Sequence, residues 1–470
     1  MKPALRILTL GVWMALGGCS LIPEYHRPDV PVTEQFKEDG TWHVARPEDQ
    51  SKRGDWWSLF QDGVLNRFEE QLEQDSLELK VALARYDAAQ AFFTEQSAQL
   101  YPEVDLGGNV FTNRESVNRP LRGSNLPNMY GNTALSMGAF YELDLWGQIR
   151  SAVASAQAQA EASRADVESA RLSLQAQLAT EYVQLRGLDA QIQILADSID
   201  AYRSELQMMQ RRHDEGIVSG LDVARSQVLL ETTESTRYKI MAERALREHA
   251  IAALLGQAPA SFSIVPTKWE AHYPPLPKTI PSEVLQRRPD IAAAERRVVA
   301  ANAQIGVARA AFYPQISLGA LGGFQNTGNG ALLTAPNSFW SLGPLAFLNI
   351  FDAGLREAAV KQATAQTQEA VAQYRIIVLG AFREVEDNLA QLRNLDQEDQ
   401  HQSLAVTAAR HTYDLATNRY REGAVSYLEV IDAENAKLRS ERAELDIQTA
   451  RLLSTVGLVR AIGGNLPEQH

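Results

Sequence analysis

The stretches "RRHDEGIVSGLDVARSQ" at 211–227 and "NRYREGAVSYLEVIDAE" at 418–434 are two versions of one pattern. Each contains Glu-Gly, then Val-Ser, then Leu, an acidic residue and Val, and the second copy follows the first by 207 residues. Gly216 and Gly423 stand where a helix would end, because glycine accepts the left-handed conformation of a helix C-terminus. Each stretch therefore predicts a tight turn after a helix.

A second helix is predicted to start directly after each turn. Ser219 and Ser426 suit the N-cap position, and each is followed three residues later by an acid, Asp222 or Glu429. This is the spacing of a capping box, for which Asp222 is the weaker match because glutamate is preferred there. Each copy is thus expected to be the tip of a helical hairpin.

The repetition extends far beyond the turns. "LYPEVDLGG" at 100–108 corresponds to "FYPQISLGA" at 312–320, and "YELDLWGQIRSAVASAQAQAEA" at 141–162 corresponds to "LNIFDAGLREAAVKQATAQTQEA" at 348–370. Each half is predicted to contain a helix, a Tyr-Pro step, a non-helical region, and a long helical hairpin. An internal duplication explains this two-fold repeat.

The long helices carry a coiled-coil pattern. Residues 151–209 contain no proline, and as one helix they would span roughly 90 Å. Apolar residues alternate at spacings of three and four, which predicts coiled-coil packing. In the first half they are Leu185, Leu188, Ile192, Leu195, Ile199, Tyr202, Leu206 and Met209, and in the second half the same stripe begins with Val378, Phe382, Val385, Leu389 and Leu392.

The regions after each Tyr-Pro change to a period of two, which predicts strands with one apolar face. Leu135 and Leu318 fall on the apolar face, and Ser136 and Ser317 on the other. The expected strands are about 103–114, 130–146, 315–326 and 337–350. Each has the length that a tilted membrane strand needs. A small soluble sheet domain fits the same alternation and is the alternative.

Four strands cannot close a membrane barrel, because the smallest single-chain barrels have about eight. Unpaired strand edges in lipid cost several kcal/mol for each backbone group. If these strands lie in a membrane, the chain must therefore oligomerise.

Composition excludes several classes of protein. The net charge of −13 over 470 residues makes nucleic acid an unfavourable partner. No apolar run after residue 20 is long enough for a transmembrane helix. The histidines form no metal motif, no catalytic or nucleotide-binding motif is present, and no cofactor or enzymatic activity is expected. "RRPD" at 287–290 predicts a helix start with salt bridges rather than an anion site.

The N-terminus has the features of a secretory signal: basic Lys2 and Arg6, the apolar run "ILTLGVWMAL", and then "GGCS". Cys19 is the only cysteine, and "LGGC" resembles a bacterial lipobox, in which the cysteine is lipidated after cleavage. Ser20 follows it, and the absence of Asp at this position implies sorting to the outer membrane. A signal peptide with an incidental thiol is the alternative.

Taken together, these segments resemble the TolC-like outer-membrane factors, and within them the lipoprotein branch that includes OprM. The resemblance covers nearly the whole chain. It is carried by "DWWSLFQDGVLNRF" at 55–68, "SEVLQRRPDIAAAERRV" at 282–298, "FDAGLREAAVKQA" at 351–363 and the second turn at 418–434. The implied fold is mainly α, with long coiled-coil hairpins forming a periplasmic tunnel and a β-barrel in the membrane.

The resemblance implies a homotrimer whose twelve strands close one barrel in the lipid of the cell outer membrane. It also implies a periplasmic adaptor (membrane fusion) protein that docks at the turns, with Gly216, Ser219, Gly423 and Ser426 at the docking surface. An inner-membrane pump of the RND type would supply the energy. The expected function is passive export of small molecules such as drugs. The alternatives are the outer-membrane conduit of a type I protein-secretion system and a lipid-anchored periplasmic scaffold. The sequence does not name the substrate.

The resemblance further implies a periplasmic gate just past the second turn. Arg419, Leu428 and Asp432 match the motif, and Leu428 and Asp432 share a helix face because they are four residues apart. In the first repeat the position of Asp432 is occupied by Arg225, which is a candidate partner charge for it. For each charged residue, a solvated helix face is the alternative.

The expected segments follow the repeat. They are a signal peptide (1–18), an N-terminal equatorial segment with the first helix (19–102), a β-hairpin (103–146), a helical hairpin (147–255), a linker (256–290), a helix (291–314), a second β-hairpin (315–350), a second helical hairpin (351–462) and a tail (463–470).

Overall fold

A computed structural model describes residues 20–30, 54–118, 127–267, 269, 272–274, 288–328 and 330–464. Cys19 and the signal segment 1–18 lie outside the described residues, as do most of the C-terminal tail and residues 275–287 of the expected linker. None of the helices among the described residues combines the length and the apolar character needed to cross a membrane.

The chain forms two compact units, each assembled from three separate stretches. The first unit contains 1–29, 85–163 and 293–375, and the second contains 30–84, 164–292 and 376–470. The elements, in chain order, are η1 (Trp56–Phe60), α2 (Gly63–Asp75), α3 (Leu77–Ala98), β1 (Glu103–Arg114), β2 (Met129–Leu143), α4 (Gln148–Asp214), α5 (Gly220–Leu254), η2 (Pro259–Ser261), α6 (Pro289–Ala310), β3 (Gln315–Asn326), η4 (Ala335–Asn337), β4 (Ser338–Phe347), α7 (Leu355–Arg421) and α8 (Tyr427–Ala461).

The helices have matching lengths in the two halves. α4 and α7 each have 67 residues, α5 and α8 each have 35, and α3 and α6 each have 22. α7 begins 207 residues after α4, and α8 begins 207 residues after α5, which is the offset of the two turns. Equal lengths at a constant offset are what the two-fold sequence repeat predicts.

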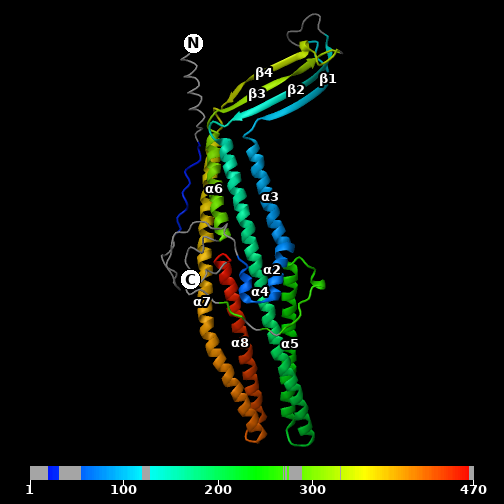
Figure 1. Cartoon of the computed structure of the whole chain (residues 1–470), viewed down its shortest axis with the longest axis vertical. Coiled ribbons are helices and arrows are strands. Elements are labelled where there is room, and N and C mark those ends of the chain that lie inside the picture. The colour runs from blue at the N-terminus through cyan, green and yellow to red at the C-terminus, as the bar shows by residue number, and fades with distance from the viewer. Residues whose placement is uncertain are drawn as a thin grey trace. The chain divides into compact units, whose positions relative to one another are not determined.

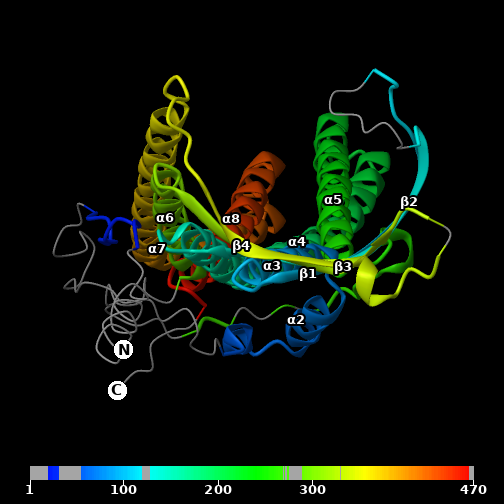
Figure 2. The ribbon, with the colours of Figure 1, turned by 90° about the horizontal axis from the view of Figure 1, so that it is seen from above.

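The first unit holds a four-stranded sheet of consecutive antiparallel strands in the order β1-β2-β3-β4. Figure 2 shows the strands side by side in a curved band. The four expected strands are confirmed, although β2 and β4 end three residues earlier than predicted. In the first hairpin, β2 ends early because of Asp144. Its carboxylate accepts hydrogen bonds from the backbone N–H groups of Ile149 (3.0 Å) and Arg150 (2.9 Å), and these bonds start α4.

In addition to the sheet, the first unit contains contacts between the described N-terminal residues and the helices α6 and α7. The backbone oxygen of Pro23 accepts a hydrogen bond from the Asn302 amide at 2.8 Å. Arg27 pairs with Glu295 at 3.1 Å and donates to the Tyr374 hydroxyl at 3.2 Å. The residues that follow Cys19 are therefore fixed along α6 and α7.

In the second unit the helices form two hairpins, α4 with α5 and α7 with α8, which are seen as adjacent pairs in Figure 1. The coiled-coil stripe is confirmed, because Leu185, Leu195 and Ile199 are at most 2% exposed. Val385 in the second half is completely buried. The apolar spacing of three and four thus forms the core of the long helices.

A buried ion network fixes the chain that follows α5. Asp189, whose side chain is 2% exposed, accepts from Arg186 at 3.0 Å and from Arg244 at 2.8 Å. Arg186 also donates to the backbone oxygen of Val265 at 3.0 Å. These bonds satisfy both guanidinium groups and hold the start of the linker against α4.

The predicted helix start at 287–290 is confirmed. Arg288 pairs with Asp290 at 2.7 Å and with Glu384 at 2.8 Å, and it donates to the backbone oxygen of Ala461. α6 begins at Pro289, where the missing backbone N–H costs nothing. Arg288 is therefore occupied by protein groups rather than left open for an anion.

Close helix packing at Gly187 gives a test of this core. A Cβ at Gly187 on α4 would lie 2.6 Å from the Thr449 hydroxyl oxygen on α8, whereas a Cβ at Gly380 on α7 would meet nothing within 4 Å. We expect Gly187→Ala to lower the thermal unfolding midpoint, because the helices must separate. The matched variant Gly380→Ala should raise it, because alanine favours the helix.

The two variants should differ by roughly 1–3 kcal/mol in unfolding free energy, a range set by overpacking costs. The measurement is thermal unfolding of the purified full-length protein followed by far-ultraviolet circular dichroism. Equal effects of the two substitutions would contradict the close approach of α4 and α8.

Candidate functional site: the open sheet and the two hairpin tips

One face of the sheet is apolar across all four strands. The register places Leu135 opposite Gly108 and Phe324, and residues directly opposite each other in a sheet share a face. The members of this face include Val104, Leu106, Val110, Leu135, Met137, Ile316, Leu318, Phe324, Trp340 and Leu342. Trp340 is 82% exposed and Val110 is 78% exposed. Large apolar side chains on this face are thus uncovered in the single chain.

The opposite face carries most of the polar and small residues of the sheet, although the apolar residues Phe111, Phe140, Leu321, Leu345 and Phe347 also lie on it. Ser136 lies opposite Gly107 and Gly323, and Ser317 lies opposite Glu142. Leu135 and Ser136 therefore point to different faces, as do Ser317 and Leu318, which confirms the alternation predicted from the sequence. Within the part of the chain that the structure describes, β1 and β4 each pair with one strand only, so both edges of the sheet carry backbone groups without a strand partner there.

The two hairpin tips have the same turn. Gly216 and Gly423 have φ values of +77° and +76°. The Ile217 N–H donates to the Arg212 oxygen at 2.8 Å, and the equivalent bond joins the Ala424 N–H to the Arg419 oxygen at 2.8 Å. These are Schellman-type helix ends, which confirms the turn that the sequence predicts.

The capping boxes differ from the expectation. Ser219 caps α5, because its hydroxyl oxygen accepts the Asp222 N–H at 3.4 Å and its O–H donates to the Asp222 carboxylate at 2.9 Å. Ser426 occupies the N-cap of α8 but makes no side-chain capping bond. The copy with the weaker sequence match is thus the capped one, and the predicted box of Ser426 with Glu429 is wrong. Asp222 can act in place of the preferred glutamate, although its side chain is shorter, because the Ser219 hydroxyl itself reaches the Asp222 carboxylate.

The residues predicted for the gate all lie at the second tip. Leu428 and Asp432 are one turn apart on α8, both exposed, and Arg419 is exposed near the end of α7. Among the described residues of the single chain, neither Arg419 nor Asp432 is in an ion pair. Arg225 instead pairs with Asp222 on its own helix at 3.7 Å, so the suggested bond to Asp432 is not formed within this chain.

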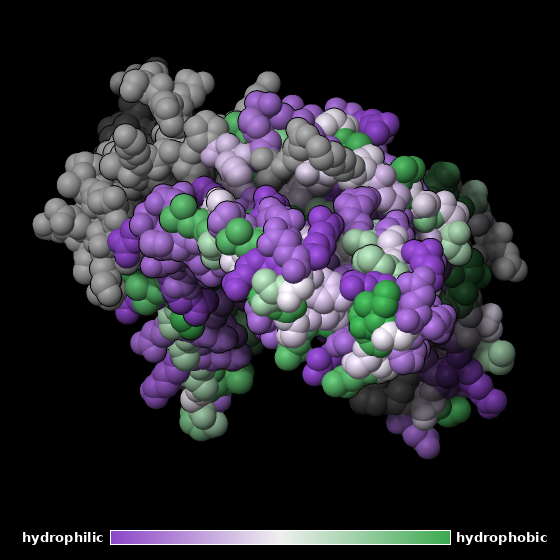
Figure 3. Space-filling view, turned by 90° about the horizontal axis from the view of Figure 1, so that it is seen from below, coloured by the Kyte–Doolittle hydropathy of each residue, from purple (hydrophilic) through white to green (hydrophobic). Residues whose placement is uncertain are grey.

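Exposed leucines occupy equivalent positions at the two tips. Leu221 is 58% exposed, and Leu428, which lies 207 residues later, is 40% exposed. Hydrophilic side chains predominate on the molecular face drawn in Figure 3, where apolar residues form small separate patches. The hairpin tips therefore carry isolated exposed apolar side chains on a mostly polar surface.

A group of contacts between the two tips was not predicted from the sequence. Arg212 on α4 donates to the Tyr420 hydroxyl on α7 at 3.3 Å, and the Ser226 hydroxyl on α5 donates to the Tyr427 hydroxyl on α8 at 2.8 Å. Met209 accepts from the Tyr420 hydroxyl at 3.7 Å. The only sequence signal is that the two copies differ here: the repeat position of Tyr427 is Gly220.

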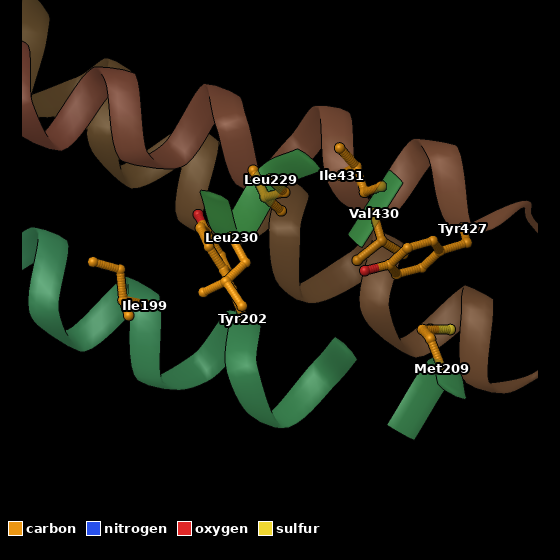
Figure 4. Packing of buried hydrophobic residues seen from close by; sticks show 8 residues of the cluster. All are labelled: Ile199, Tyr202, Met209, Leu229, Leu230, Tyr427, Val430 and Ile431. Carbon is orange, nitrogen blue, oxygen red and sulfur yellow. The ribbon is translucent and has the colours of Figure 1, made fainter. Parts of the chain in front are cut away.

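These contacts surround a buried apolar cluster. Figure 4 shows side chains from both hairpins converging in it. Its members are Ile199, Tyr202, Met209, Leu229, Leu230, Tyr427, Val430 and Ile431. The two hairpins of the chain are therefore joined near their tips by packing as well as by hydrogen bonds.

Two acidic side chains lie at this junction. Glu434 is 5% exposed, and its Oε2 atom has no hydrogen-bond partner. Burial and the neighbouring Glu205 raise the pKa of Glu434 to about 8 from its ordinary value of 4.5, against a smaller opposite effect of Lys437. Burial also raises the pKa of Glu205, although a hydrogen bond with Tyr427 opposes this. Two carboxyl groups with raised pKa thus share one buried region.

Within the part of the chain that the structure describes, no group of three or more histidine, cysteine, aspartate or glutamate side chains could hold a metal ion. The arrangement consists of a sheet with an apolar face and open edges, together with paired helical hairpins whose tips match.

Comparison with known proteins identifies the class. The family model for outer membrane efflux proteins matches residues 69–257 and 280–464. The chain therefore belongs to the outer membrane efflux protein family, a transport family, and its function is efflux at the outer membrane.

Individual relatives cover almost the whole chain. Two proteins of Pseudomonas putida, a toluene efflux pump outer membrane protein (TtgC) and an antibiotic efflux pump outer membrane protein (ArpC), are each 31% identical over 97% of this chain and 94% of their own length. The solved structure of the outer-membrane channel OprN is 28% identical, with a TM-score of 0.85 over 95% of this chain and 100% of that chain.

The raised pKa of Glu434 predicts a pH dependence. Because its pKa in the folded protein is about 8 and its ordinary value is 4.5, the folded state binds more protons between these values. Stability contributed by Glu434 is thus present at low pH and lost as pH rises through this window. We expect the thermal unfolding midpoint to fall between about pH 5.5 and about pH 8.5.

Glu434→Gln should flatten this dependence, because glutamine does not titrate. Glu243→Gln, a change of the same kind at a half-buried position on α5, should leave it as in the unchanged protein. A pH profile that is the same in all three proteins would show that Glu434 titrates in its ordinary range.

Proposed function

We propose that three copies of this chain form an exit duct through the outer membrane, in which twelve strands close one barrel. The support is the sheet: among the described residues the outer edges of β1 and β4 have no strand partner, and one face carries large exposed apolar side chains. Both features are costly for an isolated chain in lipid and are relieved when the edge of one copy pairs with the opposite edge of the next.

The apolar face would then contact lipid, and the face with Ser136 and Ser317 would line the water-filled interior. The long hairpins would continue the duct into the periplasm as a tunnel. Transport through it is passive, with energy supplied by an inner-membrane pump of the RND type through a periplasmic adaptor protein. The exposed Leu221 and Leu428 beside the two turns suit adaptor docking, together with Gly216, Ser219, Gly423 and Ser426.

The cargo is proposed to be small molecules, including drugs and solvents. Two relatives that are equally similar to this chain are named for different substrates, one for toluene and the other for antibiotics. Overall similarity therefore does not select between these substrates, and the choice is expected to rest with the pump.

The function is tested by reconstituting the purified protein in planar lipid bilayers. An exit duct gives discrete single-channel conductance, whereas a periplasmic scaffold gives none. Deletion of the gene should sensitise cells to drugs or solvents. Loss of protein secretion without any change in drug or solvent sensitivity would favour the conduit of a type I secretion system instead.

The lipid face is tested with Leu135→Arg. A cationic side chain at the middle of the bilayer costs about 2–4 kcal/mol per chain, and a trimer repeats that cost in each copy. We expect the yield of assembled trimer in outer-membrane extracts to fall sharply. Ser136→Arg, the same substitution at the adjacent position on the other face, should be tolerated better, and equal losses would mean that the faces are wrongly assigned.

The gate is tested at Arg419 and Asp432, which have no ion-pair partner in the described part of the single chain and are free to bond a neighbouring copy. Asp432→Ala combined with Arg419→Ala should raise the resting conductance in planar bilayers and sensitise cells to large antibiotics. The matched control is Lys239→Ala with Glu243→Ala, which removes an exposed pair of opposite charges on α5. If the gate variant conducts like the unchanged protein, the constriction lies elsewhere.

The lipid anchor is proposed at Cys19. The described residues that follow it are fixed along α6 and α7, so an anchored cysteine would sit directly before an ordered segment. Mass spectrometry of the mature N-terminus should find an acylated cysteine, and Cys19→Ala should reduce assembly. An unmodified thiol at Cys19 would exclude the anchor.

A further inference from the structure

A cavity lies between the two hairpins of the second unit, bounded by α4, α7 and α8. Its volume is about 420 Å³, which is large enough for a small organic molecule. The side chains that matter for its chemistry are Asp197 and Tyr202 from α4, Arg410 and Tyr413 from α7, and Glu434, Lys437, Glu441 and Glu444 from α8.

Charge is unbalanced in this cavity. Its four carboxyl groups face two cationic side chains, which leaves an excess of two negative charges when all are ionised. Arg410 is already committed to Glu441 at 2.7 Å, and the Lys437 ammonium lies over the Tyr413 ring, 4.7 Å from its centre. Among the described residues, Glu434 has no cationic partner within bonding distance.

Glu434 is the feature that marks a binding site. It lines the cavity, it is 5% exposed, and its Oε2 atom has no hydrogen-bond partner. A buried carboxyl group without a partner is costly unless a proton or a cation compensates it. Tyr202 and Tyr413 add aromatic rings beside it, and such rings favour organic cations.

The spacing of the carboxyl groups excludes a bound metal ion. No three acidic side chains among the described residues converge closely enough to hold a metal ion. An organic molecule with two separated ammonium groups can instead reach carboxylates at different points of the wall. We propose that this cavity is a binding site for an aliphatic diamine, with Glu434 binding one ammonium group and Asp197 the other.

Binding of this kind is linked to a proton. Glu434 has a pKa of about 8, so it is mostly protonated at neutral pH, and an ammonium group binds its carboxylate form. The groups that face it are Tyr202 and Glu205 from α4, Tyr413 from α7, and Tyr427 and Lys437 from α8. Of these, only Lys437 favours the carboxylate. Diamine binding therefore releases a proton, and affinity rises as pH approaches 8.

A bound diamine would bridge α4 of the first hairpin and α8 of the second. It would thus add a contact between the hairpins close to the apolar cluster at their tips. The residues that line the cavity do not include the proposed gate residues Arg419, Leu428 and Asp432.

The test is isothermal titration calorimetry of the purified full-length protein with 1,4-diaminobutane. We expect saturable binding, and at neutral pH an observed enthalpy that changes with the ionisation enthalpy of the buffer. Glu434→Gln should weaken binding by roughly tenfold or more, which is the usual effect of losing one charged hydrogen bond. Glu243→Gln should leave it unchanged.

Lys437→Gln removes a positive charge that repels the diamine, so at about pH 8.5, where the proton competes less for Glu434, it should strengthen binding, an effect that misfolding cannot produce. Magnesium ions and butylamine serve as reference ligands and should bind much more weakly. The proposal is overturned if no saturable binding is seen, if Glu434→Gln binds as the unchanged protein does, or if magnesium binds as tightly as the diamine.

Discussion

The constraint on which this structure depends is the pairing of backbone hydrogen-bonding groups in a sheet of only four strands. Among the described residues, β1 and β4 each have one strand neighbour, and the side chains of Leu135, Leu318 and Trp340 on the apolar face are exposed. Water can satisfy such edges, but lipid cannot. For a protein of the outer membrane efflux family, the cost of an unpaired strand edge in lipid is the physical reason for the proposed assembly of several copies.

The same logic explains why the helices are repeated with constant length. In the proposed trimer, the helical hairpins of several copies form one wall and must therefore be equivalent. α4 with α5 matches α7 with α8 in both helix lengths and turn geometry. Where the two copies differ, the structure has specific contacts. Tyr420 and Tyr427 bind Arg212 and Ser226 of the other hairpin. The residues that differ between the two copies therefore hold the two hairpins of one chain together.

The sequence could predict the parts of the fold that depend on local rules. Alternation fixed the faces of Leu135 and Ser136, glycine fixed the turns at Gly216 and Gly423, and the apolar stripe fixed the helix core. It could not predict which serine would cap, because the outcome depends on side-chain reach within about one ångström. It also missed Glu434, which looks like a surface residue in the helical pattern and becomes buried only through tertiary packing.

The central claim is that the open edges of the sheet are closed by other copies of the same chain. Electron cryomicroscopy of the protein extracted in mild detergent tests it most directly. The account predicts a threefold particle in which β1 of one copy pairs with β4 of its neighbour and the apolar face points outward into detergent. Particles of a single chain, or an assembly in which the edges of β1 and β4 stay unpaired, would contradict it.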